Sequence, residues 1–200
     1  AKMRDNGLFT GSLSGLSVSM GLYTDELDLY GQQSGPQTYY NNAFVASSSV
    51  TRLLWNTSYN QIYSTNAVIE GVTESTTLTT TEKNELIGEA LFVRALIHFY
   101  LTNLYGSIPY VKTTNFAQNT TIGKVSTEQV YLLAMEDLET AITYLSESYS
   151  STGRIRPNKF AARALLARIN LYAGNWEIAS NEASAVFASG RLAKISSELT

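Results

Sequence analysis

The chain has 200 residues, of which 44% are hydrophobic and 16% are charged, and its net charge is −3 at pH 7. This length suffices for one domain with a substantial core, whereas no apolar run reaches the roughly 18 residues that a membrane span requires. The absence of cysteine excludes disulfides, thiolate nucleophiles and thiolate metal ligands. Since no cluster of Lys and Arg is present, we do not expect nucleic acid as a partner.

The first 46 residues form the least regular part of the sequence. Residues 8–16 are rich in Gly and Ser, and residues 30–44 mix Gly, Gln, Pro, Asn and aromatic residues without a helical period. We therefore predict an irregular N-terminal segment over residues 1–46, made of loop with short turns. The chain begins without a hydrophobic signal region and stops without a structural terminator, so we expect a fragment that lacks material at both ends.

A long helix is predicted from about Val50 to Glu70. Residues 47–49 are all serine and are good N-cap candidates, and Gly71 is the predicted stop. Several apolar or amide side chains fall on or near one face of this helix, namely Leu54, Tyr59, Ile62, Tyr63, Asn66 and Ile69. The threonine-rich residues 76–81 then form a connector.

The next helix is apolar almost all the way round, so it must pack on several sides. Its most apolar stripe consists of Leu86, Ala90, Val93, Ile97, Tyr100, Leu101 and Leu104. Thr79 and Glu82 have the spacing of a capping box at its start, and Gly106 followed by Pro109 predicts its end. The polar side chains that remain to face a neighbour or water are Glu89, Arg94, His98 and Thr102.

Three more helices are predicted after a polar loop, over residues 127–145, 157–174 and 176–189. Ser126 and Gln129 have capping-box spacing before the first of them. Pro157 suits the first helical position of the second, and Asn175 suits the N-cap of the third.

These five helices are predicted to form antiparallel hairpins that stack, because no hairpin can bury its apolar face alone. The pair at residues 161–174 and 176–189 has the small and aromatic residues of a tetratricopeptide hairpin, although the spacing between hairpins is irregular. The predicted fold class is therefore all-α, with tetratricopeptide-like helical hairpins over residues 47–195 stacked as an irregular solenoid with long loops.

Four motifs in order resemble the N-terminal half of the SusD/RagB family, and the match spans roughly residues 50–195. The first is similar to the family's W-x-x-x-Y-x-x-I-x-x-x-N-x-x-I helix and contains Trp55, Tyr59, Ile62 and Asn66. The second resembles G-E-A-x-F-x-R-A-x-x-x-F-x-L…(Y/F)-G-x-(V/I)-P, the third D-L-x-x-A, and the fourth G-R-x-x-K-x-A-A-x-A-L-L-A-R-x-x-L-Y-x-x-(D/N)-W. These three lie at residues 88–111, 137–141 and 154–176.

The resemblance implies a single SusD-like N-terminal helical domain over residues 1–200. It implies a surface-exposed lipoprotein of the outer membrane of Bacteroidetes, which binds oligosaccharide or polysaccharide without catalysis and without a cofactor. The implied partner is a SusC-like TonB-dependent transporter that receives the glycan. The lipidated cysteine that would anchor such a protein is absent from this chain, and so is the C-terminal half, which supplies part of the family's glycan site.

The sequence contains no catalytic constellation, so we predict no enzyme and no catalytic or metal site. The one tight acidic cluster comprises Asp25, Glu26 and Asp28; we interpret it as a solvated turn or helix cap, with a contribution to calcium binding as the alternative. His98 is the only histidine and is interpreted as a hydrogen-bonded packing residue. Four charged residues within the helices are expected to reach partners on adjacent helices, namely Glu89, Arg94, Arg163 and Arg168.

The candidate carbohydrate-binding residues are Tyr39, Tyr40 and Asn42. Sugars present apolar CH faces flanked by hydroxyls, so their sites combine a flat aromatic ring with amide and carboxylate groups. Residues 39–44 supply the aromatic rings and the amides of such a composition. The alternative is that both tyrosines cover the exposed end of the helix stack.

Other functions stay open at this point. Helical-repeat surfaces commonly bind proteins, so the chain is alternatively a protein-interaction scaffold. Capture of a non-sugar cargo such as a peptide or siderophore is a further alternative, whereas a glycosidase is the least supported.

Overall fold

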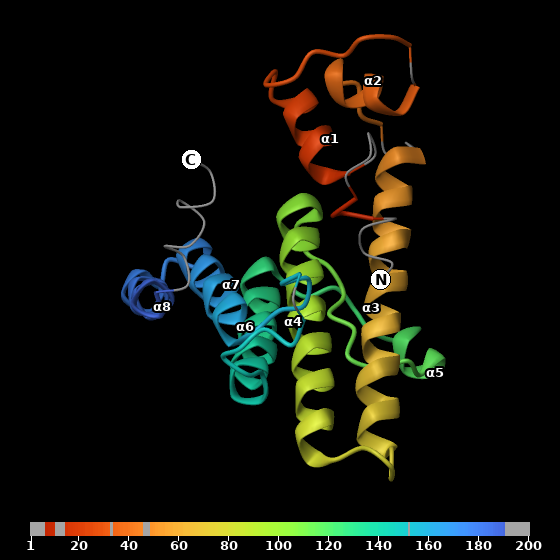
Figure 1. Cartoon of the computed structure of the whole chain (residues 1–200). Coiled ribbons are helices and arrows are strands. Elements are labelled where there is room, and N and C mark those ends of the chain that lie inside the picture. The colour runs from red at the N-terminus through yellow and green to blue at the C-terminus, as the bar shows by residue number, and fades with distance from the viewer. Residues whose placement is uncertain (1–6, 11–14, 33, 46–48, 152, 191–200) are drawn as a thin grey trace. The chain divides into compact units, whose positions relative to one another are not determined.

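The computed structural model of the protein describes residues 7–10, 15–32, 34–45, 49–151 and 153–190. Eight helices and no strand occur among these residues, which confirms the predicted all-α class (Figure 1). The helices are α1 (Leu16–Tyr23), α2 (Ser34–Tyr40), α3 (Ser49–Glu74), α4 (Thr80–Tyr105), α5 (Phe116–Asn119), α6 (Thr127–Tyr144), α7 (Lys159–Tyr172) and α8 (Trp176–Ala188). None of them combines the length and the apolar character needed to cross a membrane.

The chain divides into two compact units, residues 1–61 and 62–200, and α3 runs across the boundary between them. In the first unit, α1 packs against α2. The prediction of loop throughout residues 8–46 was wrong for these two helices. Both have eight residues or fewer and contain Gly and Ser, so packing rather than a sequence period stabilises them.

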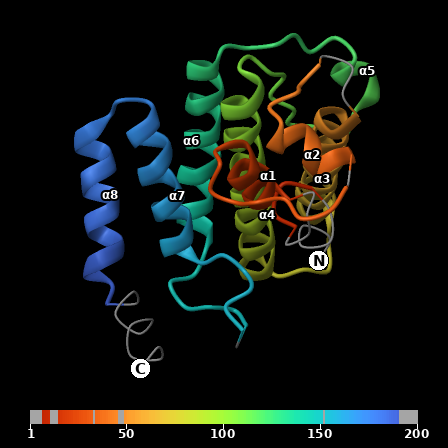
Figure 2. The ribbon, with the colours of Figure 1, turned by 90° about the horizontal axis from the view of Figure 1, so that it is seen from above.

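The second unit is a row of packed helices, in which α4 contacts α6, α6 contacts α7 and α7 contacts α8 (Figure 2). Helices that follow one another in the chain therefore lie side by side, which confirms the predicted stacking of hairpins. The loop between α4 and α6 holds the short helix α5 and one isolated antiparallel bridge, which joins Ile108 to Val125.

Helix α4 is the central element of the second unit, and its ends were predicted correctly. The side chain of Thr79 accepts from the backbone N–H of Glu82, and the Glu82 carboxylate accepts from the N–H of Thr79, so the capping box is complete. Gly106 ends the helix with φ of 73°. Side chains on several faces of α4 are buried, as its apolar composition predicted.

Two boundaries differ from the sequence prediction. Gly71 does not end α3, which continues to Glu74, because a helical Gly costs only about 1 kcal/mol and no terminator follows directly. Pro157 precedes α7 by two residues, and Asn158 is the N-cap instead, its side chain accepting from the N–H of Ala161. The cap candidates Ser47 and Ser48 lie outside the described residues.

Of the two other predicted N-caps, the one of α6 is confirmed in part and the one of α8 does not cap through its side chain. The Ser126 side chain accepts from the Gln129 N–H at 3.3 Å, which confirms that half of the predicted capping box. Asn175 occupies the N-cap position of α8, but its side chain does not cap the helix. It donates instead to Oδ1 of Asn170 at 3.0 Å.

Gly88 permits the close approach of α4 to the C-terminal end of α6. A Cβ at this position would lie 3.0 Å from Cγ of Leu145 and 3.1 Å from Cβ of Tyr144. We expect Gly88→Val to lower the free energy of unfolding by about 2 kcal/mol, since overpacking of this kind costs about 1–3 kcal/mol.

Gly71 provides the matched control in urea denaturation, because it also lies within a helix but has open space where a Cβ would point. Gly71→Ala is expected to raise the free energy of unfolding by up to about 1 kcal/mol through helix propensity. Equal effects of the two substitutions would show that Gly88 is not a packing position.

Candidate functional site

A buried ionic cluster in the second unit contains several residues of the sequence motifs. Arg94 on α4 forms two hydrogen bonds of 2.7 Å with Asp137 on α6, one to each carboxylate oxygen. Its Nη1 donates to Oδ1 of Asn66 on α3 at 2.9 Å. All three side chains are buried. The cluster thus ties α3, α4 and α6 together within this unit.

The loop after α4 is attached to the same cluster. The hydroxyl of Tyr110 donates to Asp137 at 2.7 Å, and the Tyr110 ring stacks on His98 with 3.9 Å between centroids. Nε2 of His98 accepts from the N–H of Val111 at 3.2 Å, so the proton lies on Nδ1, which donates to the carbonyl of Arg94. Burial lowers the pKa of His98 to about 4 and keeps the ring neutral.

The hydrogen bonds of this cluster run between side chains and backbone of the chain itself, so its geometry supports the fold rather than a ligand. The prediction that Arg94 finds a partner on an adjacent helix is confirmed, and so is that of His98 as a hydrogen-bonded packing residue. Sequence reasoning did not identify Tyr110 and Asp137 as their partners. The signal for Asp137 was its place in the D-L-x-x-A motif, where a buried helix position carries a charge.

The other charged helix residues also have structural partners. Arg163 on α7 donates to Glu182 on α8 at 2.7 Å, and Arg168 donates to the hydroxyl of Tyr100 on α4 at 3.2 Å. Glu89 pairs with Arg156, which lies in the segment before α7 rather than on a helix as predicted.

The first unit holds the residues that the sequence indicated for carbohydrate. Tyr39 and Tyr40 are the last two residues of α2 rather than part of a loop. Asn42 follows with φ of 51°, the left-handed conformation that Asn tolerates better than most residues. The N–H of Asn42 donates to the carbonyl of Tyr39, and that of Ala43 to Thr38, which is a Schellman ending. This turn explains the presence of Asn42 independently of any ligand.

Tyr39 and Tyr40 differ in exposure. Tyr39 is only 7% exposed, hydrogen-bonded to Ser19, and its ring packs edge-on against Phe44 with 5.0 Å between centroids. Burial raises the pKa of the Tyr39 hydroxyl. Tyr40 and Phe44 are each 37% exposed. Tyr39 therefore supports the ring of Phe44 from beneath, whereas Tyr40 and Phe44 are partly exposed to solvent.

Further aromatic and acidic residues of the same unit are exposed. Tyr23 packs edge-on against Phe44, with 5.6 Å between centroids, and Tyr30 is 88% exposed. Asp25 stands directly beyond α1 with φ of 60°, so it belongs to a helix-ending turn, as the sequence interpretation favoured. Within the described parts of the chain, no three His, Cys, Asp or Glu side chains are placed to hold a metal ion.

The known proteins to which this chain is similar are all SusD-like proteins in the comparisons that follow. A SusD-like family model described as "Starch-binding associating with outer membrane" matches residues 20–171. SusD-like protein P25 of Formosa agariphila is 25% identical over 149 residues, which cover 72% of this chain and 28% of that protein. A crystal structure of a SusD superfamily protein from Bacteroides vulgatus has a TM-score of 0.78 and 27% identity, covering 92% of this chain and 40% of that one.

A structure named as a laminarin-binding SusD-like protein shares the fold, with a TM-score of 0.75 and 21% identity over 90% of this chain and 39% of that one. These likenesses confirm the tetratricopeptide-like character of the helical stack. The chain spans less than a third of the length of the curated relatives and about 40% of these two solved chains.

Proposed function

Because the chain belongs to the SusD-like family, we propose that it takes part in capturing oligosaccharide or polysaccharide at the outer membrane for nutrient uptake. The family description names starch binding and association with the outer membrane, and SusD-like carbohydrate-binding proteins are non-catalytic. One relative of the same fold is named for laminarin binding. The function proposed here is therefore binding without turnover.

The surface that we assign to this binding lies in the first unit and comprises Tyr40, Asn42 and Phe44, with Tyr39 beneath it. The observation that supports it is the partial exposure of two aromatic rings close together in the chain, Tyr40 and Phe44, of which Phe44 packs on the buried ring of Tyr39. An aromatic face takes the CH surface of a pyranose, while an amide donates and accepts hydrogen bonds with its hydroxyls. These are the two components that a non-catalytic sugar site needs.

Delivery to a SusC-like TonB-dependent transporter, and attachment to the cell surface by a lipid, complete the proposal. Both follow from the family resemblance, and the description of association with the outer membrane supports the location. In this scheme the protein holds the glycan at the cell surface and passes it to the transporter by docking.

The test is a glycan array followed by calorimetric titration of the full-length protein. We expect binding of a glycan without turnover and, in Tyr40→Ala, an affinity lower by about tenfold, which corresponds to about 1.4 kcal/mol. Asn42→Gly retains the left-handed turn and removes the amide, so a weaker effect of the same sign is expected. Tyr39→Phe keeps the supporting ring and should bind as the unchanged protein does.

Tyr172→Ala is the matched control, because Tyr172 is more than half exposed but lies on α7 in the second unit. Affinity that is unchanged in Tyr40→Ala would refute this surface. Binding of peptides or of a protein partner, with no affinity for any glycan, would favour the cargo or scaffold alternatives instead.

A further inference from the structure

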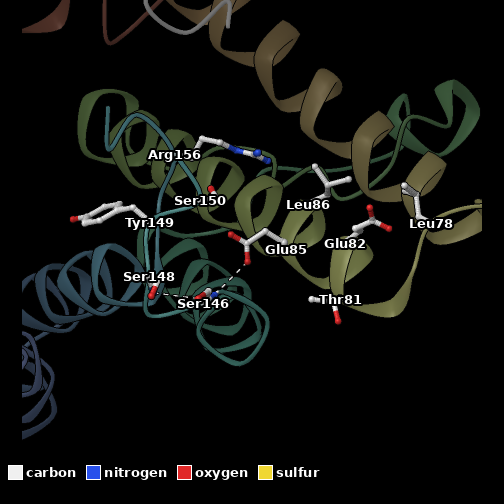
Figure 3. A pocket seen from close by; sticks show the side chains of 10 residues that line it. All are labelled: Leu78, Thr81, Glu82, Glu85, Leu86, Ser146, Ser148, Tyr149, Ser150 and Arg156. Carbon is white, nitrogen blue, oxygen red and sulfur yellow. Dashed lines mark hydrogen bonds between the residues drawn. The ribbon is translucent and has the colours of Figure 1, made fainter. Parts of the chain in front are cut away.

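A cavity suited to a ligand lies entirely within the second unit, between the first half of α4 and the segment that joins α6 to α7. Its volume is about 480 Å³, within the roughly 300–1,000 Å³ typical of small-molecule sites. Its lining residues are Leu78, Thr81, Glu82, Glu85, Leu86, Ser146, Ser148, Tyr149, Ser150 and Arg156 (Figure 3).

The joining segment is attached to the helices at both of its ends, which makes the cavity a built feature. At its start, the N–H of Ser146 donates to the carboxylate of Glu85 on α4 at 3.3 Å. At its end, the Asn158 side chain donates to the carbonyl of Glu147 at 3.0 Å, and the N–H of Lys159 donates to that of Ser146 at 2.9 Å. The segment therefore closes on itself beside α4.

A guanidinium group that lines this cavity is held in a fixed position by a carboxylate beside the cavity. Nε and Nη2 of Arg156 donate to Oε2 of Glu89 at 2.9 and 2.5 Å, so the planar guanidinium is oriented. Oε1 of Glu89 is buried without a hydrogen-bond partner. Glu85, one helical turn earlier, lines the cavity itself. Oriented donors and acceptors of this kind suit a ligand rich in hydroxyl groups.

The two ends of the cavity provide apolar surface. Leu78 and Tyr149 lie far apart along it, as Figure 3 shows, and Leu86 stands between them on α4. The Tyr149 ring is half-buried, and the guanidinium of Arg154 lies over it at 5.4 Å from its centroid. An aromatic ring, aliphatic side chains and serine hydroxyls together match the mixed surface of a saccharide better than that of a lipid or a purely apolar ligand.

We propose that this cavity is a second carbohydrate site, which binds one or two uncharged sugar units of a glycan. Three carboxylates lie in or beside the cavity, those of Glu82, Glu85 and Glu89, against two guanidinium groups, those of Arg154 and Arg156. This excess of negative charge selects against uronate or sulfated sugars. The inference rests on the proposed function, since it assumes that glycans are the ligands. It adds a site in the other unit of the chain.

The test is hydrogen–deuterium exchange of the full-length protein with saturating laminarihexaose, maltohexaose, mannohexaose and xylohexaose, beside oligogalacturonate as the anionic probe. We expect a neutral probe to protect residues 78–86 and 146–151 from exchange, while oligogalacturonate does not. Tyr149→Ala and Glu85→Gln are expected to remove this protection and to weaken binding at this site by about tenfold. Glu177→Gln on α8 is the control for Glu85→Gln.

The readout separates this proposal from the function on which it rests. In Tyr40→Ala, protection of residues 78–86 should persist, because the cavity is independent of the first unit. Binding of neutral glycans with protection in the first unit alone would refute the cavity and leave the proposed function standing. Protection by oligogalacturonate, or no response to any neutral probe, would also overturn the proposal.

Discussion

Asp137→Asn is expected to lower the free energy of unfolding by about 3–5 kcal/mol, the largest effect of any substitution considered for this chain. The asparagine keeps the volume of the side chain but removes the charge that faces Arg94. Both side chains are only 6% exposed, so the guanidinium would remain buried without a counter-charge. The Tyr110 hydroxyl would at the same time lose its carboxylate acceptor.

Glu136, the residue directly before Asp137, supplies a matched control. Glu136 on α6 pairs with Lys112 at 3.3 Å, but these side chains are 63% and 45% exposed, so Glu136→Gln should change the stability by less than about 1 kcal/mol. Urea denaturation followed by circular dichroism measures both variants. If Asp137→Asn were as mild as Glu136→Gln, the cluster would not be a stabilising element of the second unit.

The double variant Arg94→Met, Asp137→Leu tests whether an uncompensated buried charge causes the loss of stability in Asp137→Asn. Removing both charges leaves no uncompensated ion, so the double variant is expected to lose less stability than the sum of the two single variants. Additive losses would indicate that packing volume, rather than the buried charge, explains the effect of Asp137→Asn.

The second large effect is a loss of stability in mild acid, which we attribute to His98. Its pKa in the folded protein is about 4, whereas the ordinary value is 6.5, so the unfolded state binds the proton more readily. The stabilisation is complete above pH 6.5 and is lost as the pH falls towards 4. Over this window it amounts to about 3 kcal/mol at most, since one unit of pKa corresponds to about 1.4 kcal/mol.

Protonation of His98 would act on the loop that follows α4. The charged ring has no acceptor nitrogen left, so the hydrogen bond from the N–H of Val111 would be lost. Denaturation curves between pH 7.5 and 4 should therefore be compared for the unchanged protein and His98→Gln. The carboxylates titrate in both proteins, so the difference between the two profiles reports His98 alone. If stability fell with pH equally in both proteins, His98 would not be the cause of the loss of stability in mild acid.

The local signals in the sequence identified the long helices and several of their ends. The capping box at Thr79, the stop at Gly106 and the apolar character of α4 depend on neighbours within a few residues. Such interactions join residues that are close in the chain, so they can be predicted without knowledge of distant contacts. The same reasoning failed at Gly71, because a single Gly weakens a helix without ending it.

The short helices and the role of Asn42 needed the tertiary structure. Helices α1 and α2 are too short to show a reliable period, and they are stabilised by packing on each other. The sequence placed Tyr39 and Tyr40 together as candidates, but only the fold separates the buried ring from the exposed one. Adjacent residues of a helix point in directions about 100° apart, so their burial is decided by what lies beside each.

By itself, then, the sequence determined the all-α class, the long helices and the family, because helix periodicity, caps and ordered motifs are all short-range patterns. It also showed that Arg94 would need a buried partner. Only the tertiary structure decided that the partner is Asp137, 43 residues away, and that the segment after α6 returns to α4 to form a cavity. Contacts between distant segments follow from which surfaces bury together, and a linear sequence does not specify that pairing.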